Sequence, residues 1–210
     1  LSISENAELI KAAIAERALS KKPLLLIGYS KGANDILEAL SDPAAAAKVS
    51  AAVTLGGAVY GSELIARLPA ILHTAIEQTP FPGCQRSDSA VMDHLSPDHR
   101  SNYMVNWSAP ENVALYSMVG LPSNDRVSRL LKPAHQALLR DGIANDGQVG
   151  LSGATISGAR VLGYLNADHW AMALPIEANV VKVVEPLVDQ NAFPRKALLK
   201  AMIDTVGAEI

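Results

Sequence analysis

The chain has 210 residues, of which 49% are hydrophobic and 19% are charged, and its formal net charge is −3. This composition supports one domain with a sizeable core, and the lack of any Lys/Arg cluster argues against nucleic-acid binding. Cys84 is the single cysteine, which excludes an internal disulfide and a cysteine metal site, and no apolar run approaches the roughly 20 residues that span a membrane.

Apolar periodicity predicts an alternation of helices and strands. Ser2 and Glu5 have capping-box spacing, and the apolar residues that follow share one face, which predicts a helix over 4–20. Buried strands are predicted at 23–29, 50–57, 112–120 and 159–165. Further helices are predicted at 31–41, 127–140, 176–190 and 194–207. Helices between strands imply right-handed crossovers, so the predicted fold class is α/β, with a mostly parallel sheet flanked by helices.

Residues 61–110 form an insertion between the second and third predicted strands. Its helical patterns lie at 62–78, 87–95 and 97–107. The insertion is too long for a simple crossover and leaves from the carboxyl ends of the strands, where ligands bind in open α/β sheets. We therefore interpret it as a helical cap within a single domain, 1–210; the alternative is an insertion that packs away from the site.

The segment Gly28-Tyr29-Ser30-Lys31-Gly32 joins a predicted buried strand directly to a predicted helix. A Gly-x-Ser-x-Gly sequence in this position is typical of a nucleophile elbow, in which the serine lies on a sharp turn above the sheet. The flanking glycines lack a Cβ, so strand and helix can approach closely. The helix N-terminus would then direct N–H groups toward an oxyanion beside Ser30. The alternative is a tight turn without chemistry.

A serine nucleophile needs a base, and the chain has five histidines to consider. His169 follows the fourth predicted strand directly, so its loop opens at the same sheet edge as Ser30, and we expect it to be the base. The other four lie on predicted cap helices, on a surface-like turn or in the 127–140 helix: His73, His94, His99 and His135.

Three aspartates could orient this base. Asp146 lies in a tight Asn-Asp-Gly loop between the third and fourth strands and is the favoured acid. Asp125 is the alternative, although it could instead cap the helix that begins near Arg126. Asp168 is adjacent to His169, and neighbouring side chains of an extended segment point in opposite directions. The favoured order along the chain is Ser30, Asp146, His169.

With these residues in this order, the chain resembles the α/β-hydrolase superfamily, and within it lipase- and esterase-like members. The resemblance rests on the segments 24–32, 145–149 and 166–175. It implies that Ser30 is the nucleophile, Asp146 the acid and His169 the base, and that the Lys31 backbone N–H is an oxyanion donor. The implied function is cleavage of a carboxylic ester of a small molecule or lipid through an acyl-enzyme.

Two aromatic residues adjoin this predicted site, and no metal or organic cofactor is expected. Tyr29 precedes the nucleophile and Trp170 follows the base, so both are candidates for contact with substrate. Simple packing beside the turn or in the core is the alternative for each of them.

The sequence departs from the family pattern before the first predicted strand. The family fold has several strands there, and a loop after one of them gives a second oxyanion N–H, whereas this chain predicts a helix. We therefore expect it to be part of a longer protein, with the missing strands upstream. A minimal or inactive hydrolase is the alternative, as are a non-catalytic binding module, an acyltransferase and a thioesterase.

Overall fold

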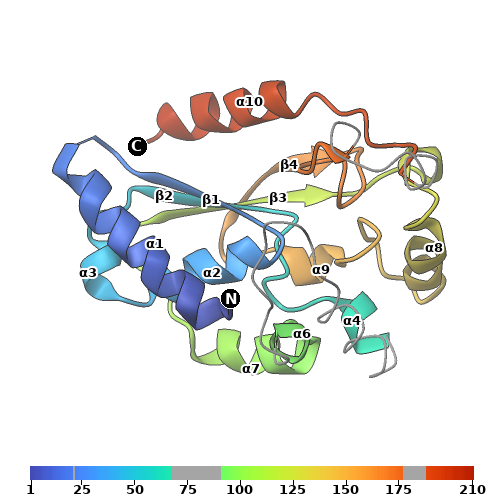
Figure 1. Cartoon of the computed structure of the whole chain (residues 1–210), viewed down its shortest axis with the longest axis horizontal. Coiled ribbons are helices and arrows are strands. Elements are labelled where there is room, and N and C mark those ends of the chain that lie inside the picture. Colours follow the sequence, from blue (N-terminus) through green and yellow to red (C-terminus); the bar gives the residue numbers. More distant parts are fainter. Residues whose placement is uncertain (21, 68–90, 177–187) are drawn as a thin grey trace.

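A computed structural model describes residues 1–20, 22–67, 91–176 and 188–210 (Figure 1). Within them, four strands form one sheet in the order β1-β2-β3-β4, and every neighbouring pair is parallel. The strands are β1 (Leu25–Tyr29), β2 (Ala51–Leu55), β3 (Ala114–Gly120) and β4 (Arg160–Leu165). The predicted strands and the α/β fold class are therefore confirmed.

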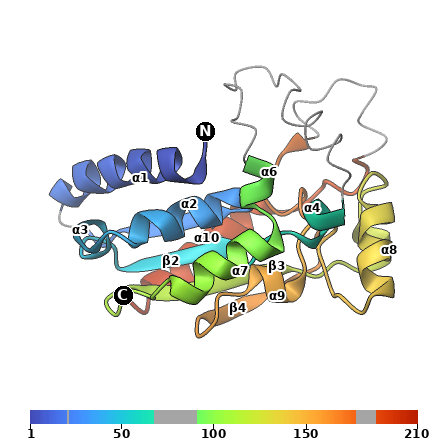
Figure 2. The ribbon, with the colours of Figure 1, turned by 90° about the horizontal axis from the view of Figure 1, so that it is seen from below.

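Helices cover both faces of this sheet. The helices in the described part of the chain are α1 (Ile3–Arg17), α2 (Lys31–Leu40), α3 (Pro43–Ala46), α4 (Glu63–Arg67), α6 (Val91–His94), α7 (Pro97–Asn106), α8 (Lys132–Arg140), α9 (Leu151–Ala154) and α10 (Arg195–Gly207). In Figure 1, α10 lies on one face of the sheet, whereas α1, α2 and α3 lie on the other. Figure 2 shows α7 next to α2, on the side away from α10.

The alternation of side chains along β1 explains this layering. Leu25, Ile27 and Tyr29 pack into the core cluster that includes Met202 and Val206 of α10. Leu24, which precedes β1, and Leu26 pack on the other face, against a cluster that includes residues of α1, α2 and α3. β2 is buried along its whole length, as expected for a strand inside a parallel sheet covered by helices.

The helix predicted at 127–140 begins later than the sequence pattern indicated. A short 3-10 turn (Asn124–Arg126) comes first, Val127 has an extended backbone, and α8 begins only at Lys132. The buried Asp168 carboxylate accepts a hydrogen bond from the Ser128 backbone N–H at 2.7 Å. The Ser128 N–H, near the predicted helix start, is thus bound by a residue that is distant in the sequence. Local apolar periodicity could not reveal such a contact.

Other predicted helices are confirmed where the structure describes them, with shifted ends. The predicted helix at 4–20 is α1 followed by a 3-10 turn (Ala18–Ser20), and that at 194–207 is α10. Most of 176–190 lies outside the described residues, and 188–190 is not helical. The short helices α3 and α9 were not predicted; Asp42 at the N-cap with Pro43 after it was a start signal for α3.

The insertion at 61–110 is described only in part. α4 and α6 fall within the predicted helices 62–78 and 87–95, and α7 matches 97–107. α7 contacts α2, and the Trp107 Nε1–H at its end donates to the Leu37 carbonyl at 3.1 Å. Residues 68–90 lie outside the described residues, so the helical cap stays a prediction.

β1 forms one edge of the described sheet. A groove of about 430 Å³ runs beside it and is lined by residues of α1, β1 and α2. Edge strands in natural proteins commonly carry charges or prolines, whereas the 24–27 segment is entirely apolar. The expectation that further strands extend the sheet at this edge stays a prediction.

Candidate active site

Ser30 occupies a strained turn between β1 and α2. Its backbone has φ 52° and ψ −123°, and it has the sole positive φ of any non-glycine residue in the described part of the chain. Such a conformation costs about 1–3 kcal/mol and persists only where surrounding contacts impose it. The Ser30 N–H donates to the Leu55 carbonyl at 3.1 Å, and its carbonyl accepts from Ala33 and Ala58. The neighbouring strand and the new helix therefore hold the turn.

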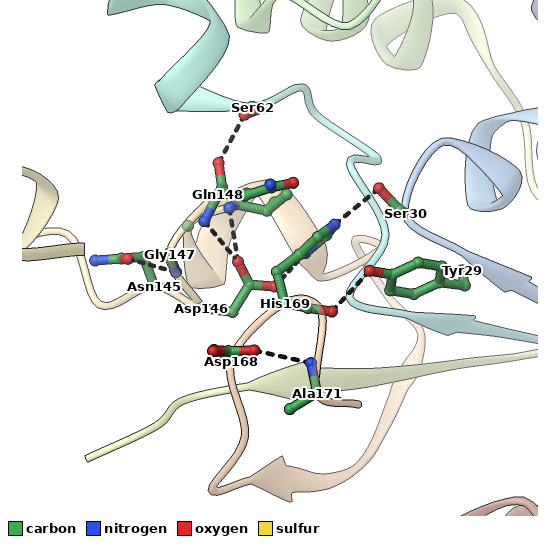
Figure 3. Close-up of polar contacts among 12 residues, drawn as sticks. Tyr29, Ser30, Ser62, Asn145, Asp146, Gly147, Gln148, Asp168, His169 and Ala171 are labelled. Atoms are coloured by element: carbon green, nitrogen blue, oxygen red, sulfur yellow. Dashed lines mark hydrogen bonds and ion pairs between the residues drawn. The ribbon is translucent and has the colours of Figure 1, made fainter. Parts of the chain in front are cut away.

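The hydroxyl of Ser30 does not cap its own helix. A serine at an N-cap commonly accepts a hydrogen bond from a backbone N–H of the first turn, but no such bond is present here. Instead, Ser30 Oγ lies 2.9 Å from His169 Nε2 (Figure 3). The strained turn thus directs the hydroxyl toward the loop after β4.

His169 and Asp146 are joined by two hydrogen bonds. His169 Nδ1 lies 2.7 Å from Asp146 Oδ2, and the His169 N–H donates to the Asp146 carbonyl at 2.8 Å. Both side chains are almost fully buried. An ionised carboxylate can only accept, so Nδ1 carries the proton and Nε2 is left to accept from the Ser30 hydroxyl.

The Asp146 carboxylate is held by its own loop. Asp146 Oδ1 accepts backbone N–H bonds from Gln148 at 2.9 Å and from Val149 at 2.8 Å. Together with the bond from His169, these donors compensate a carboxylate that has been removed from water. The loop therefore fixes the direction in which the acid points.

A second layer of contacts holds this acid loop in place. Asn145 Nδ2 donates to the carbonyls of His135 and Ile143, so its Oδ1 is the acceptor for the Gly147 N–H and for His135 Nδ1. His135 is buried, and Asn145 satisfies its ring nitrogen Nδ1. From the start of the insertion, the Ser62 hydroxyl donates to the Gln148 carbonyl at 2.6 Å (Figure 3). No sequence pattern indicated this support.

Glycines at the ends of β2 and β3 leave room for the acid. A Cβ added to Gly56, whose φ is +51°, would lie 2.7 Å from Met172 Sδ and 3.4 Å from Asp146 Oδ2. A Cβ on Gly120 would lie 2.9 Å from Asp146 Cβ and 2.8 Å from the Ala167 carbonyl oxygen. A larger residue at Gly120 would therefore press on Asp146, whereas one at Gly56 would first meet the Met172 side chain.

The two glycines around Ser30 differ in their surroundings. A Cβ on Gly28 would lie 2.5 Å from the Gly32 carbonyl oxygen and 2.7 Å from Ala33 Cα, as expected where strand and helix meet closely. A Cβ on Gly32 would meet no described atom within 4 Å. The close approach predicted for both glycines is therefore present only at Gly28 in the described structure.

The two aspartates that were not favoured lie elsewhere. Asp125 is exposed on the 3-10 turn after β3, where a hydrogen bond with the Ser123 side chain lowers its pKa. Asp168 is fully buried, but its carboxylate accepts from the backbone N–H groups of Ser128 and Ala171 at 2.7 and 2.8 Å. Its side chain thus anchors the histidine loop and does not contact the imidazole.

The structure places the remaining predicted site residues around Ser30 and His169. Lys31 is the first residue of α2, so its backbone N–H has no acceptor within the helix, and its Nζ pairs with Asp35 at 2.7 Å. Tyr29 donates its hydroxyl to the His169 carbonyl, and Trp170 is partly buried beside the histidine. These positions leave the predicted oxyanion and substrate roles as proposals.

No group of three or more His, Cys, Asp or Glu side chains in the described part of the chain could hold a metal ion. None of the helices described is long and apolar enough to cross a membrane.

Comparison with solved structures identifies the fold. A metagenomic carboxyl esterase, MGS0156, superposes with a TM-score of 0.89 at 31% identity, over 100% of this chain and 63% of that protein. Bacillus licheniformis lipase BlEst2 in its mature form gives 0.65 at 20% identity, over 89% and 74% of the two chains. Phospholipase PlaB from Legionella pneumophila gives 0.54 at 15% identity, over 74% and 34%.

The chain therefore has the α/β-hydrolase fold, and it spans less than two thirds of the esterase to which it is similar. No protein-family model and no curated protein sequence matches it.

Proposed function

We propose that this chain carries the catalytic centre of a serine hydrolase that cleaves carboxylic esters. The observation that carries the proposal is the continuous hydrogen-bonded series from Ser30 Oγ through the His169 imidazole to the Asp146 carboxylate. Ser30 is the nucleophile, His169 the general base and Asp146 the acid that orients it. The structure of a carboxyl esterase that is 31% identical to this chain supports the choice of an ester as substrate.

The geometry suits acyl transfer through a covalent intermediate. As the Ser30 oxygen attacks the ester carbonyl, His169 Nε2 takes the hydroxyl proton and later gives it to the leaving alcohol. Asp146 holds the imidazole in the tautomer that can accept this proton and stabilises the imidazolium that forms. Water then attacks the acyl-enzyme, with His169 again acting as base, and releases the acid.

The Lys31 backbone N–H is the proposed oxyanion donor. It begins α2 directly after the nucleophile, where unpaired N–H groups and the helix dipole both favour negative charge. Removing one donor from an oxyanion hole costs about 10²–10³ in turnover, so a second donor is expected in the active protein. We assign no residue of this chain to that second position.

Labelling with a fluorophosphonate tests the nucleophile. The probe should modify the wild-type protein, and Ser30→Ala should abolish the modification. Ser128→Ala is the matched control, because Ser128 is also buried and its hydroxyl has no hydrogen-bond partner in the described structure. Ser128→Ala should be labelled like the wild type, and labelling that survives Ser30→Ala would exclude Ser30 as nucleophile.

A panel of acyl donors then tests the reaction. Hydrolysis of p-nitrophenyl esters of increasing chain length defines the acyl group, and comparison with a thioester and with added alcohol acceptors tests thioesterase and transferase activity. Wild-type protein that neither labels nor turns over any of these would support the alternative of a non-catalytic binding module.

A further inference from the structure

The Tyr29 hydroxyl is used within the site itself. Tyr29 Oη donates to the main-chain carbonyl oxygen of His169 at 2.7 Å (Figure 3). The rings of the two residues also lie close, with centroids 5.1 Å apart and planes inclined by 35°. Tyr29 is the residue before Ser30, so the contact joins the end of β1 to the loop after β4.

Burial keeps this hydroxyl protonated. Removal of the Tyr29 phenol from water raises its pKa, and the nearby carboxylates of Asp146 and Asp168 raise it further. A phenol that does not ionise in the working range of an enzyme remains a hydrogen-bond donor. The phenol can therefore donate to the His169 carbonyl throughout that range.

The contact closes a ring through the site. Tyr29 is bonded covalently to Ser30, and its phenol donates a hydrogen bond to the His169 carbonyl. The imidazole of the same His169 lies within hydrogen-bond distance of Ser30 Oγ, which completes the ring. Asp146 holds the His169 N–H from the other side. Both main-chain polar groups of His169 are thus fixed, one by Asp146 and the other by the neighbour of the nucleophile.

We propose that Tyr29 is a positioning residue, whose hydroxyl sets the distance between His169 Nε2 and Ser30 Oγ. This inference rests on the proposed serine hydrolase function and replaces substrate contact as the role of the Tyr29 hydroxyl. Proton transfer depends steeply on distance, and a misplacement of about 1 Å can cost about 10²-fold in rate. Removal of the Tyr29 hydroxyl, one of several restraints on His169, should lower the reaction rate by less, about 10-fold.

Tyr29→Phe isolates the hydroxyl, because it keeps the ring contact with His169. Tyr116→Phe is a matched control: Tyr116 lies in the same core cluster and donates a hydrogen bond of the same length, 2.7 Å, but to Glu209 near the C-terminus. Both variants lose one phenolic hydrogen bond and should fold. Tyr29→Phe should lower kcat and the rate of fluorophosphonate labelling about 10-fold with KM unchanged, whereas Tyr116→Phe should keep wild-type values.

The kinetic outcomes separate positioning from the alternatives. A rise in KM at constant kcat would assign the hydroxyl to substrate binding and overturn the proposal. Wild-type kcat in Tyr29→Phe, or an equal loss of kcat in Tyr116→Phe, would overturn it as well.

A second readout does not require ester hydrolysis. The His169 Nδ1 proton that faces Asp146 should give a downfield proton NMR signal, and its exchange with solvent reports how firmly the imidazole is held. Tyr29→Phe should speed this exchange about 10-fold, whereas Tyr116→Phe should leave it unchanged. If the wild type proves inactive, the proposed function fails and this exchange rate alone decides the positioning role: unchanged exchange in Tyr29→Phe overturns it.

Discussion

Asp146→Asn tests the assignment of the acid most directly. The substitution keeps the size of the side chain, and the remaining amide oxygen can still accept from the backbone N–H groups of Gln148 and Val149. The amide NH₂ then faces His169 Nδ1 across the present distance of 2.7 Å. Two donors cannot share that contact, so the imidazole adopts the tautomer with its proton on Nε2. In that state His169 cannot accept the proton of Ser30.

The expected loss follows from this tautomer change. Forcing the wrong tautomer in a Ser-His-Asp site lowers kcat by about 10⁴, which corresponds to about 5.4 kcal/mol at 1.36 kcal/mol for each factor of ten. The free energy of unfolding should change much less, because the two backbone bonds survive. Ester hydrolysis and urea unfolding, measured on the same preparation, separate the two effects.

Asp125→Asn is the matched control, because Asp125 is exposed on the turn after β3. It should keep wild-type kcat within about twofold, since exposed substitutions remote from special contacts have small effects. The reasoning is refuted if Asp146→Asn retains more than a tenth of wild-type kcat, or if Asp125→Asn shows the larger loss.

Three further predictions follow from the packing and burial around the site. Gly28→Ala should lower the unfolding free energy by about 1–3 kcal/mol, because the new Cβ overpacks against Gly32. Gly32→Ala, whose Cβ meets no described atom within 4 Å, should change it by less than about 1 kcal/mol, and equal losses of the two variants in urea unfolding would contradict the packing argument. Gly120→Ala should reduce kcat/KM about 10²-fold, because its Cβ would lie 2.9 Å from Asp146 Cβ and displace the acid; unchanged kcat/KM would show that the loop adapts freely. Burial raises the pKa of Tyr29, so the unfolded chain releases the phenol proton first and the folded state loses stability as pH rises above about 10. The stability advantage of wild type over Tyr29→Phe should therefore shrink there, by up to about 1.4 kcal/mol for each pH unit. A constant difference in urea unfolding at alkaline pH would argue against a buried phenol.

Local signals were enough to find the strands and to select Ser30, His169 and Asp146. Four apolar runs predicted the strands within a few residues. β2 is buried along its whole length, as predicted, whereas β4 exposes Arg160 and Tyr164, so the prediction of a buried strand was wrong there. His169 was favoured because a loop after a parallel strand opens at the sheet edge that carries Ser30, and the structure places their side chains 2.9 Å apart. These inferences needed chain order and residue type alone.

Other features depend on residues that are distant in the sequence. Ser128 lies within the helix predicted at 127–140, and its N–H donates to Asp168, 40 positions away in the sequence, so no local window contains both residues. The bond from Tyr29 to the His169 carbonyl spans 140 positions, so local sequence patterns could not predict it. The hydrogen bond from the Ser62 hydroxyl to the Gln148 carbonyl spans 86 positions, and no sequence pattern indicated it.

The sequence by itself determined the α/β class, the strand order along the chain and the Gly-x-Ser-x-Gly turn, since periodicity, apolar runs and turn residues are local properties. Tertiary structure alone decided which way each hydroxyl and carboxylate of the site points. Ser30 could have capped α2 and Asp168 could have approached His169, and hydrogen bonds from other strands and loops direct them elsewhere. The physical reason is that a buried polar group must find a partner, and in this site most partners come from parts of the chain far away in sequence.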